Sequence, residues 1–156
     1  MTPAHQAFLR RALAEATKAQ HIFPEMAACE AALESHFGES VLAIQDNNLF
    51  GMKAHRHMNP AYGVVNLPTR EFENSEWIQT EASWCKYPDW ASCFADRITT
   101  LKRLASVYPH YAHALEAGSG VTYVREVSQT WSTDPARADK VLTIYDEIAG
   151  DWNATA

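Results

Sequence analysis

The sequence predicts a mainly helical α+β domain with a small β lobe inserted at about residues 47–87. Three observations predict this fold class. Apolar residues recur at helical spacing on both sides of the lobe, over about 3–38 and 90–148. Between 47 and 87 that period disappears, and glycine, proline and asparagine divide the chain into short runs. The length of 156 residues suits one core, so we expect residues 1–156 to form a single domain.

Capping signals mark the first two helices. Thr2-Pro3 supplies a cap and a proline at the first helical position, and the apolar period that follows fades near Gln20. A second helix is predicted to start at Pro24 and to end at Gly38, a typical C-terminal stop. Its middle is almost entirely small or apolar, so we expect this helix to be central and buried. Residues 40–46 are expected to add one or two turns.

The remaining elements are predicted from turn-forming residues and from the spacing of apolar residues. The lobe is expected to hold two or three short strands, with runs at 62–65 and 69–72 among them. Helices are then predicted, in order, at 90–107, 109–117, 121–131 and 135–148, the last capped by Asp134.

Composition excludes several classes of protein. A net charge of −6 argues against nucleic acid as a partner, because phosphate binding uses clustered lysine and arginine. No apolar run is long enough to span a membrane, and the first twenty residues lack a signal-peptide core, so we expect neither membrane insertion nor an export signal. The chain has an odd number of cysteines, namely Cys29, Cys85 and Cys93. This favours buried free thiols, with a Cys85–Cys93 bridge as the alternative.

Glu34 stands where an apolar helix runs into a glycine stop. The small and apolar residues before it, together with Phe37, are expected to exclude water from its carboxyl group. Exclusion of water favours the protonated acid, as does the negative end of the helix dipole. A protonated carboxyl can give its proton to a leaving oxygen. Glu34 is therefore predicted to be a general acid, against the alternative of a paired structural glutamate.

Cleavage of a glycosidic bond usually needs a second carboxylate. Glu71 and Glu73 lie in the β lobe, and strand alternation puts both on the face opposite Phe72. The residue pattern alone does not choose between them, and a solvated strand face explains either one.

Five segments in order carry a resemblance to a known family. They read AALESHFGES, NNLFGMKA, PTREFEN, WCKYPDW followed by FADRITTLKR, and WSTDPARADKVLTIY. Over about Phe8 to Ile148 the chain resembles the bacterial and phage β-N-acetylglucosaminidases of glycoside hydrolase family 73, within the lysozyme-like superfamily. The resemblance implies a lysozyme-like helical domain with an inserted β lobe.

The resemblance also implies roles for single residues. Glu34 matches the general acid at the floor of the cleft, and Glu71 matches the position where the family often has its second carboxylate. Phe50 is expected close to the sugars, while Tyr87 and Trp131 are expected to offer aromatic faces to pyranose rings.

Other family positions are structural or differ in this chain. Asn48 and Gly51 are expected to shape the wall between the two lobes. The family often has Gly-Trp where this chain has His36-Phe37, and arginine where it has Cys85. A tyrosine often found near the family's cleft is replaced by Arg137, which leaves the role of the last helix open.

The function implied is hydrolysis of peptidoglycan at the β-1,4 bond between N-acetylglucosamine and N-acetylmuramic acid. The alternatives are a muramidase, a lytic transglycosylase or a non-catalytic wall-binding module of the same fold. We expect a monomer that uses no cofactor and acts on glycan strands. Without an export signal, the protein is expected to accumulate in the cytoplasm as a phage endolysin released by a holin, or as an effector injected into a rival's periplasm.

Other reactive side chains do not form a recognisable site. His55 and His57 could be two zinc ligands, but no third and fourth ligand follow at standard spacing. His110 and His113 lie three apart on a predicted helix without an H-E-x-x-H motif, which favours surface histidines. Cys29 lacks the histidine and asparagine motifs of a thiol nucleophile. No metal site is therefore predicted.

Overall fold

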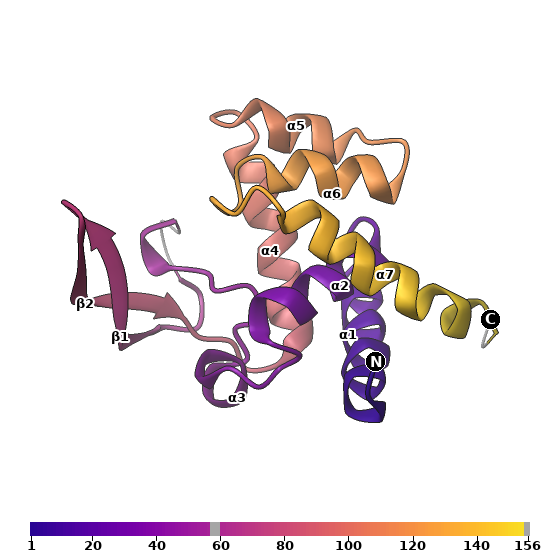
Figure 1. Ribbon diagram of the computed structural model, residues 1–156, viewed down its shortest axis with the longest axis horizontal. Coiled ribbons are helices and arrows are strands. Elements are labelled where there is room, and N and C mark those ends of the chain that lie inside the picture. The colour runs from indigo at the N-terminus through magenta and orange to yellow at the C-terminus, as the bar shows by residue number, and fades with distance from the viewer. Residues whose placement is uncertain (57–59, 155–156) are drawn as a thin grey trace.

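The computed structural model describes residues 1–56 and 60–154, apart from the side chains of residues 56, 71 and 72. A helical body forms most of it, and a two-stranded hairpin projects from one side (Figure 1). The elements, in chain order, are α1 (Pro3–Lys18), α2 (Pro24–Ser35), α3 (Val41–Asp46), the 3-10 turn η1 (Ala54–Arg56), β1 (Val64–Glu73), β2 (Glu76–Cys85), α4 (Trp90–Leu104), α5 (Pro109–Leu115), α6 (Gly120–Ser128) and α7 (Arg137–Ala154). The predicted fold class is confirmed.

The first two helices begin where their capping signals predict. Thr2 Oγ1 accepts a hydrogen bond from the backbone N–H of His5 over 3.1 Å, and Pro3 opens α1. Helix α2 opens at Pro24, but it ends at Ser35, three residues before the predicted stop at Gly38. The helix ends early because residue 36 already has a left-handed backbone conformation.

Helix α2 is the buried centre of the helical body and packs against α1 and α7. Its small residues let neighbouring backbones approach closely. The apolar residues of α2 that are fully or almost fully buried are Met26, Ala27, Ala28, Cys29, Ala31 and Ala32. The prediction of a central buried helix is confirmed, but two of its buried residues are polar, because Glu30 and Ser35 are buried as well.

The β lobe is one long hairpin rather than several short strands. Strands β1 and β2 pair antiparallel from Val64 opposite Cys85 to Glu73 opposite Glu76. Asn74 and Ser75 connect them with positive φ angles of 49° and 65°, as a two-residue hairpin turn requires. The hairpin's far end extends away from α5, α6 and α7 (Figure 1).

The last helix begins later than predicted and runs further. Asp134 Oδ1 accepts a hydrogen bond from the backbone N–H of Ala136 over 2.9 Å, which closes a turn before α7 starts at Arg137. The helix continues past Ile148 to Ala154. In the described ranges, no helix combines the length and apolar character needed to cross a bilayer.

Candidate active site

Three consecutive left-handed residues end α2 directly after Glu34 and Ser35. The φ angles of His36, Phe37 and Gly38 are 51°, 55° and 82°. Ser35 supports this turn from inside, because its hydroxyl donates to the carbonyl of Ala31 over 2.6 Å and accepts from the N–H of Gly38 over 2.8 Å. The chain thus leaves the helix abruptly, and Glu34 stands in its last turn.

Glu34 lies where two surface hollows meet. Its side chain is 24% exposed, in contrast to the complete burial of Glu30 one turn earlier. One hollow, of about 390 Å³, lies toward Phe50, Lys53 and the loop 130–133. The other, of about 320 Å³, lies toward α3 and the start of β1. Glu34 is therefore the carboxylate at the middle of an extended groove.

Trp84 of β2 borders both hollows, as do Glu34 and Gly51, so it forms part of the wall that they share. The Lys53 ammonium lies 5.2 Å from the centroid of its ring. Neither residue was predicted as part of the site. Trp84 opens the segment WCKYPDW, but no local pattern distinguishes a tryptophan that lines a groove from one in the core.

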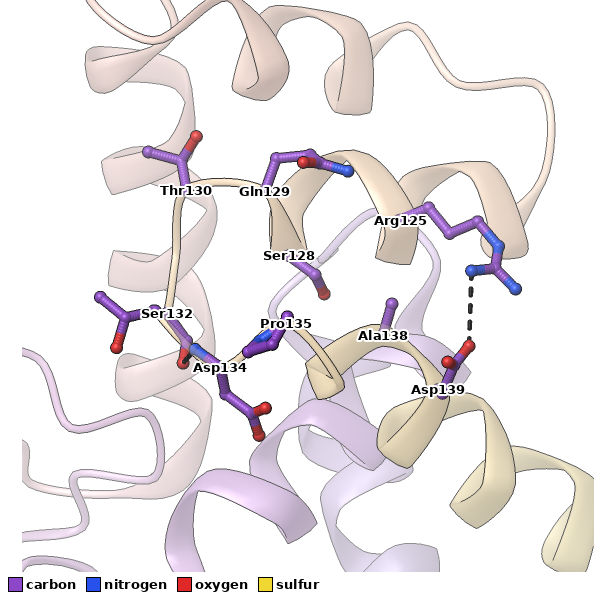
Figure 2. Close-up of a pocket in the computed structure, with 10 residues that line it drawn as sticks. Arg125, Ser128, Gln129, Thr130, Ser132, Asp134, Pro135, Ala138 and Asp139 are labelled. Carbon is purple, nitrogen blue, oxygen red and sulfur yellow. Dashed lines mark hydrogen bonds and ion pairs between the residues drawn. The ribbon is translucent and has the colours of Figure 1, made fainter.

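A larger hollow of about 560 Å³ lies next to the groove, between α6 and the start of α7 (Figure 2). Its rim carries polar side chains, including the ion pair of Arg125 and Asp139 at 3.4 Å. It does not include Glu34, but it shares Thr130, Ser132 and Thr133 with the hollow that does. We place the chemistry at the smaller hollows because, unlike the larger one, they combine a partly exposed acid with aromatic walls.

Arg137, at the start of α7, binds the carboxylate of Glu34 from the buried side. Its Nε donates to Glu34 Oε1 over 2.8 Å, its Nη2 to Glu30 Oε2 over 2.7 Å, and its Nη1 to Ser128 Oγ over 2.8 Å. The guanidinium is almost completely buried. The sequence predicted apolar surroundings for Glu34; the structure instead has a cation against one of its oxygens. Within the described residues, no other hydrogen bond reaches the side chain of Glu34, so its Oε2 makes none.

Glu30 anchors this arrangement. Arg97 binds both of its oxygens, with Nη1 donating to Oε1 over 3.1 Å and Nη2 to Oε2 over 2.7 Å, and the Tyr123 hydroxyl donates to Oε1 over 2.9 Å. Burial alone would raise the pKa of Glu30, but the adjacent Arg97 and Arg137 guanidiniums outweigh it and lower the pKa to about 2. Two arginines and two glutamates thus form one network, and Glu34 is its solvent-facing member.

The far side of the network is closed by His21. Its Nε2 lies 3.3 Å from Arg97 Nη1 and its Nδ1 lies 2.6 Å from the carbonyl of Ile22. Because arginine only donates and a carbonyl only accepts, these contacts assign the proton to Nδ1 of a neutral ring. Burial, assisted by Arg97, lowers the pKa of His21 to about 4.

The buried network also supports the aromatic wall of the groove. The Arg97 guanidinium carbon lies 4.3 Å from the centroid of the Trp131 ring and 4.7 Å from that of Phe50. Both rings border the hollow that contains Glu34, although each is less than a tenth exposed. The structure therefore brings together Glu34, Phe50 and Trp131, three of the predicted site residues.

Tyr87 is not brought to the groove. Its ring is buried, and its hydroxyl donates to the Asp96 carboxylate behind the wall. Burial is the leading cause that raises its pKa. Tyr87 does not border either hollow at Glu34. Trp84, which was not predicted as a site residue, borders both hollows.

The second carboxylate was predicted on β1. Glu71 pairs there with Ile78, but its side chain lies outside the described residues. Glu73 is exposed next to the hairpin turn, opposite Glu76. Among the described residues that border the two hollows, Glu34 is the only carboxylate.

The residues predicted as structural have structural contacts. Asn48 is buried and donates its amide hydrogens to the carbonyls of Met52 and Cys85, both over 3.0 Å, while its Oδ1 accepts from the N–H of Met52. These bonds tie the wall loop to the end of β2. Gly51 has φ 61°, in the left-handed region that favours glycine.

None of the alternative site residues that the structure describes borders the two hollows at Glu34. Cys29 is a buried free thiol whose pKa is raised by burial, which opposes a nucleophilic role. Cys85 and Cys93 are free and buried as well. His55 is exposed in η1, and His57 lies outside the described residues.

Comparison with known proteins identifies the family of the chain. Residues 10–150 match the model of the Glucosaminidase family, described as mannosyl-glycoprotein endo-beta-N-acetylglucosaminidase. The chain is 30% identical over 139 residues to the peptidoglycan hydrolase FlgJ of Vibrio parahaemolyticus, covering 86% of this chain and 43% of the relative. It is also 30% identical over 138 residues to the exo-glucosaminidase LytG of Bacillus subtilis, covering 82% and 48%. This chain spans less than half the length of either relative.

Solved structures share the fold. The catalytic domain of the Listeria monocytogenes autolysin Auto superposes with a TM-score of 0.78 at 24% identity, covering 94% of this chain and 85% of that one. A peptidoglycan hydrolase mutant from Sphingomonas sp. A1 gives 0.70 at 26% identity, covering 89% and 91%. The glycoside hydrolase domain of Salmonella typhimurium FlgJ, truncated at its C-terminus, gives 0.71 at 25%, covering 94% and 98%.

Proposed function

Because this chain belongs to the glucosaminidase family of glycoside hydrolases, family 73, we propose that it hydrolyses peptidoglycan at the β-1,4 bond between N-acetylglucosamine and N-acetylmuramic acid. The observation that carries the proposal is Glu34, a partly exposed carboxylate midway along a groove with aromatic walls. The names of its relatives, a peptidoglycan hydrolase and an exo-glucosaminidase, support the same substrate class.

Glu34 acts as the general acid in this proposal. Arg137 holds Oε1, which leaves Oε2 to carry the proton toward the groove. The proton passes to the glycosidic oxygen as the bond from that oxygen to C1 of N-acetylglucosamine breaks. A water oxygen then bonds to C1 and gives up a proton, so the net change is the addition of one water across the bond.

The sugar rings are proposed to lie along the aromatic wall. Trp84, Phe50 and Trp131 border the hollows on either side of Glu34, and pyranose rings pack well against aromatic faces. The almost completely buried guanidinium of Arg137 and the buried guanidinium of Arg97 fix this wall and the acid relative to each other. A glycan strand held across Glu34 would have its scissile bond next to Oε2.

Glu71 is the better candidate for a second carboxylate than Glu73. Leu67 of β1 borders the hollow at Glu34, and position 71 is four residues further along the same strand. At about 3.4 Å per residue, position 71 is about 14 Å beyond Leu67 and position 73 about 20 Å. Glu71 would activate the attacking water. If it does not, the acetamido group of the substrate itself would attack C1.

Replacing Glu34 by glutamine tests the proposal. The glutamine amide keeps an oxygen to accept from Arg137 but has no proton to give to the leaving group, so the fold should persist while lysis of purified cell walls falls at least about 100-fold. Circular dichroism and thermal melting provide the folding control. Undiminished lysis by a folded Glu34→Gln protein would refute the assignment.

Mass spectrometry of the released muropeptides identifies the bond that is cut. N-acetylglucosamine at the new reducing end supports the proposal. A muramic acid end would assign a muramidase, and an anhydromuramic end a lytic transglycosylase. Wall binding without release of any fragment would assign a non-catalytic module.

We further propose that the domain reaches the wall from the cytoplasm, either through a holin or by injection into a rival cell. The gene's neighbours test this: a holin gene supports the first route, and an immunity gene or secretion cluster the second. An export signal encoded upstream in the natural gene would contradict both.

A further inference from the structure

Two histidines and a glutamate converge on the surface between α5 and α6. His110 and His113 lie three apart on α5, and Glu126 lies on α6. The Nδ1 atoms of His110 and His113 are 2.7 and 3.7 Å from Glu126 Oε2, and one ligand atom from each residue lies within 4.8 Å of the others. The two helices run side by side above α7 in Figure 1. This cluster is separate from the groove at Glu34, because none of its members borders either hollow there.

We propose that His110, His113 and Glu126 form a binding site for a divalent transition-metal ion such as Zn²⁺, which links α5 to α6. Zinc binds imidazole nitrogen at about 2.0–2.1 Å and carboxylate oxygen at about 2.0–2.2 Å, so tetrahedral ligand atoms are about 3.3 Å apart. The observed separations of 2.7 and 3.7 Å lie on either side of that value. The ligand atoms of the two histidines lie within 4.8 Å of each other, and both side chains are exposed, so rotation of these side chains would bring the three atoms to that spacing.

The donor set selects the class of ion. Imidazole suits zinc, copper, nickel and iron, whereas calcium and magnesium take oxygen ligands. Glu126 makes no ion pair with lysine or arginine within the described residues, and the adjacent Arg125 is paired with Asp139 of α7. The carboxylate is thus available to a cation, and three protein ligands leave a fourth position for water.

The location gives the ion a structural role. Helices α5 and α6 have only seven and nine residues, and short helices depend on tertiary contacts for their stability. Tyr111 of α5 packs on Trp131, and Ser128 of α6 accepts a hydrogen bond from Arg137. An ion linking the two helices would therefore stabilise the segment that supports the groove's wall.

Thermal melting with and without Zn²⁺, after removal of bound metal with a chelator, tests the site. At a hundredfold excess of free Zn²⁺ over its Kd, the unaltered protein should melt about 5 °C higher than without metal. The double variant His110→Ala/His113→Ala and the single variant Glu126→Gln should lose most of this rise. His55→Ala, which removes an exposed histidine outside the cluster, should keep it.

The visible absorption of bound Co²⁺ should distinguish the same proteins. Binding should give the ligand-field absorption of a four-coordinate ion in the unaltered protein and in His55→Ala, and none in the double variant. The three buried cysteines are common to all variants, so any metal that they take up cancels in the comparison. An equal rise in melting temperature for the double variant, or no rise in the unaltered protein, would overturn the proposal. Neither readout depends on wall hydrolysis.

Discussion

Arg137 Nε donates a hydrogen bond to Glu34 Oε1 over 2.8 Å, across 103 positions of sequence. The resemblance drew attention to residue 137 only as a departure, an arginine in place of a family tyrosine. The contact makes it the residue that orients the proposed acid. The orientation is firm because the same guanidinium is bound to Glu30 and Ser128.

Replacing Arg137 by lysine tests this orienting role. Lysine keeps the positive charge but not the planar fork that reaches three acceptors at once. Glu34 should then sample other rotamers, and kcat should fall by about 10- to 100-fold while KM changes little. Steady-state kinetics on soluble glycan fragments separates the two constants.

Ser128→Ala is the matched control for that variant. It removes a neutral acceptor from Arg137 and leaves both contacts with the glutamates, so kcat should stay within about threefold of the unaltered protein. A kcat for Arg137→Lys that equals the control's would contradict the orienting role.

Glu71→Gln separates the two mechanisms left open for the attacking group. If Glu71 activates water, the variant should lose most of its activity and the unaltered enzyme should invert the anomeric configuration. If the acetamido group attacks, configuration is retained and the variant keeps most of its activity. NMR of the first-formed anomer gives the configuration, and Glu73→Gln is the neighbouring control.

Local signals predicted much of the fold. Thr2-Pro3 and Pro24 identify helix starts because capping depends on residues within one turn. The end of α2 was misplaced by three residues, since the left-handed turn after Ser35 is supported by packing of Phe37 on His5 and Phe8 of α1. That packing joins segments which the local pattern does not connect.

The site was predictable only in part, because its contacts also join segments that are far apart in the sequence. Glu34 and its aromatic neighbours were identified, but the arginine network joins α2, α4, α6 and α7. One signal for it was present in the sequence. Glu30 lies one turn before Glu34 within a run of small apolar residues, and a carboxylate buried there needs a cationic partner. The partner's identity follows only from the fold.

His36→Gly should stabilise the protein by about 1 kcal/mol, because the left-handed conformation strains a residue with a Cβ but not glycine. The exposed side chain of His36 makes no hydrogen bond or ring contact within the described residues that its removal would cost. The family often has glycine here, in agreement with this reasoning. Urea unfolding measures the change.

Phe37→Gly, at the next residue, should have the opposite effect on stability. Its φ of 55° is nearly the same, so the backbone gain is similar, but the ring's contacts with His5 and Phe8 are lost. Stability should therefore fall, by about 1–3 kcal/mol. If His36→Gly lowered stability as Phe37→Gly does, backbone strain would not be the controlling factor at His36.

Acid should destabilise the protein in two separate steps. The folded-state pKa of His21, about 4, lies below its ordinary value of 6.5, so the buried neutral ring contributes fully above pH 6.5 and its contribution is lost as the pH falls toward 4. This loss is roughly 3 kcal/mol. Glu30 has a pKa of about 2 against an ordinary 4.5, so its contribution is lost only below about pH 4.5.

Urea unfolding measures the free energy of unfolding, and its change between pH 7 and pH 4.5 should therefore come mainly from His21. His21→Gln should flatten the slope in that window, whereas His55→Gln, an exposed control, should leave it unchanged. A slope that persists in His21→Gln would assign the upper step to another group.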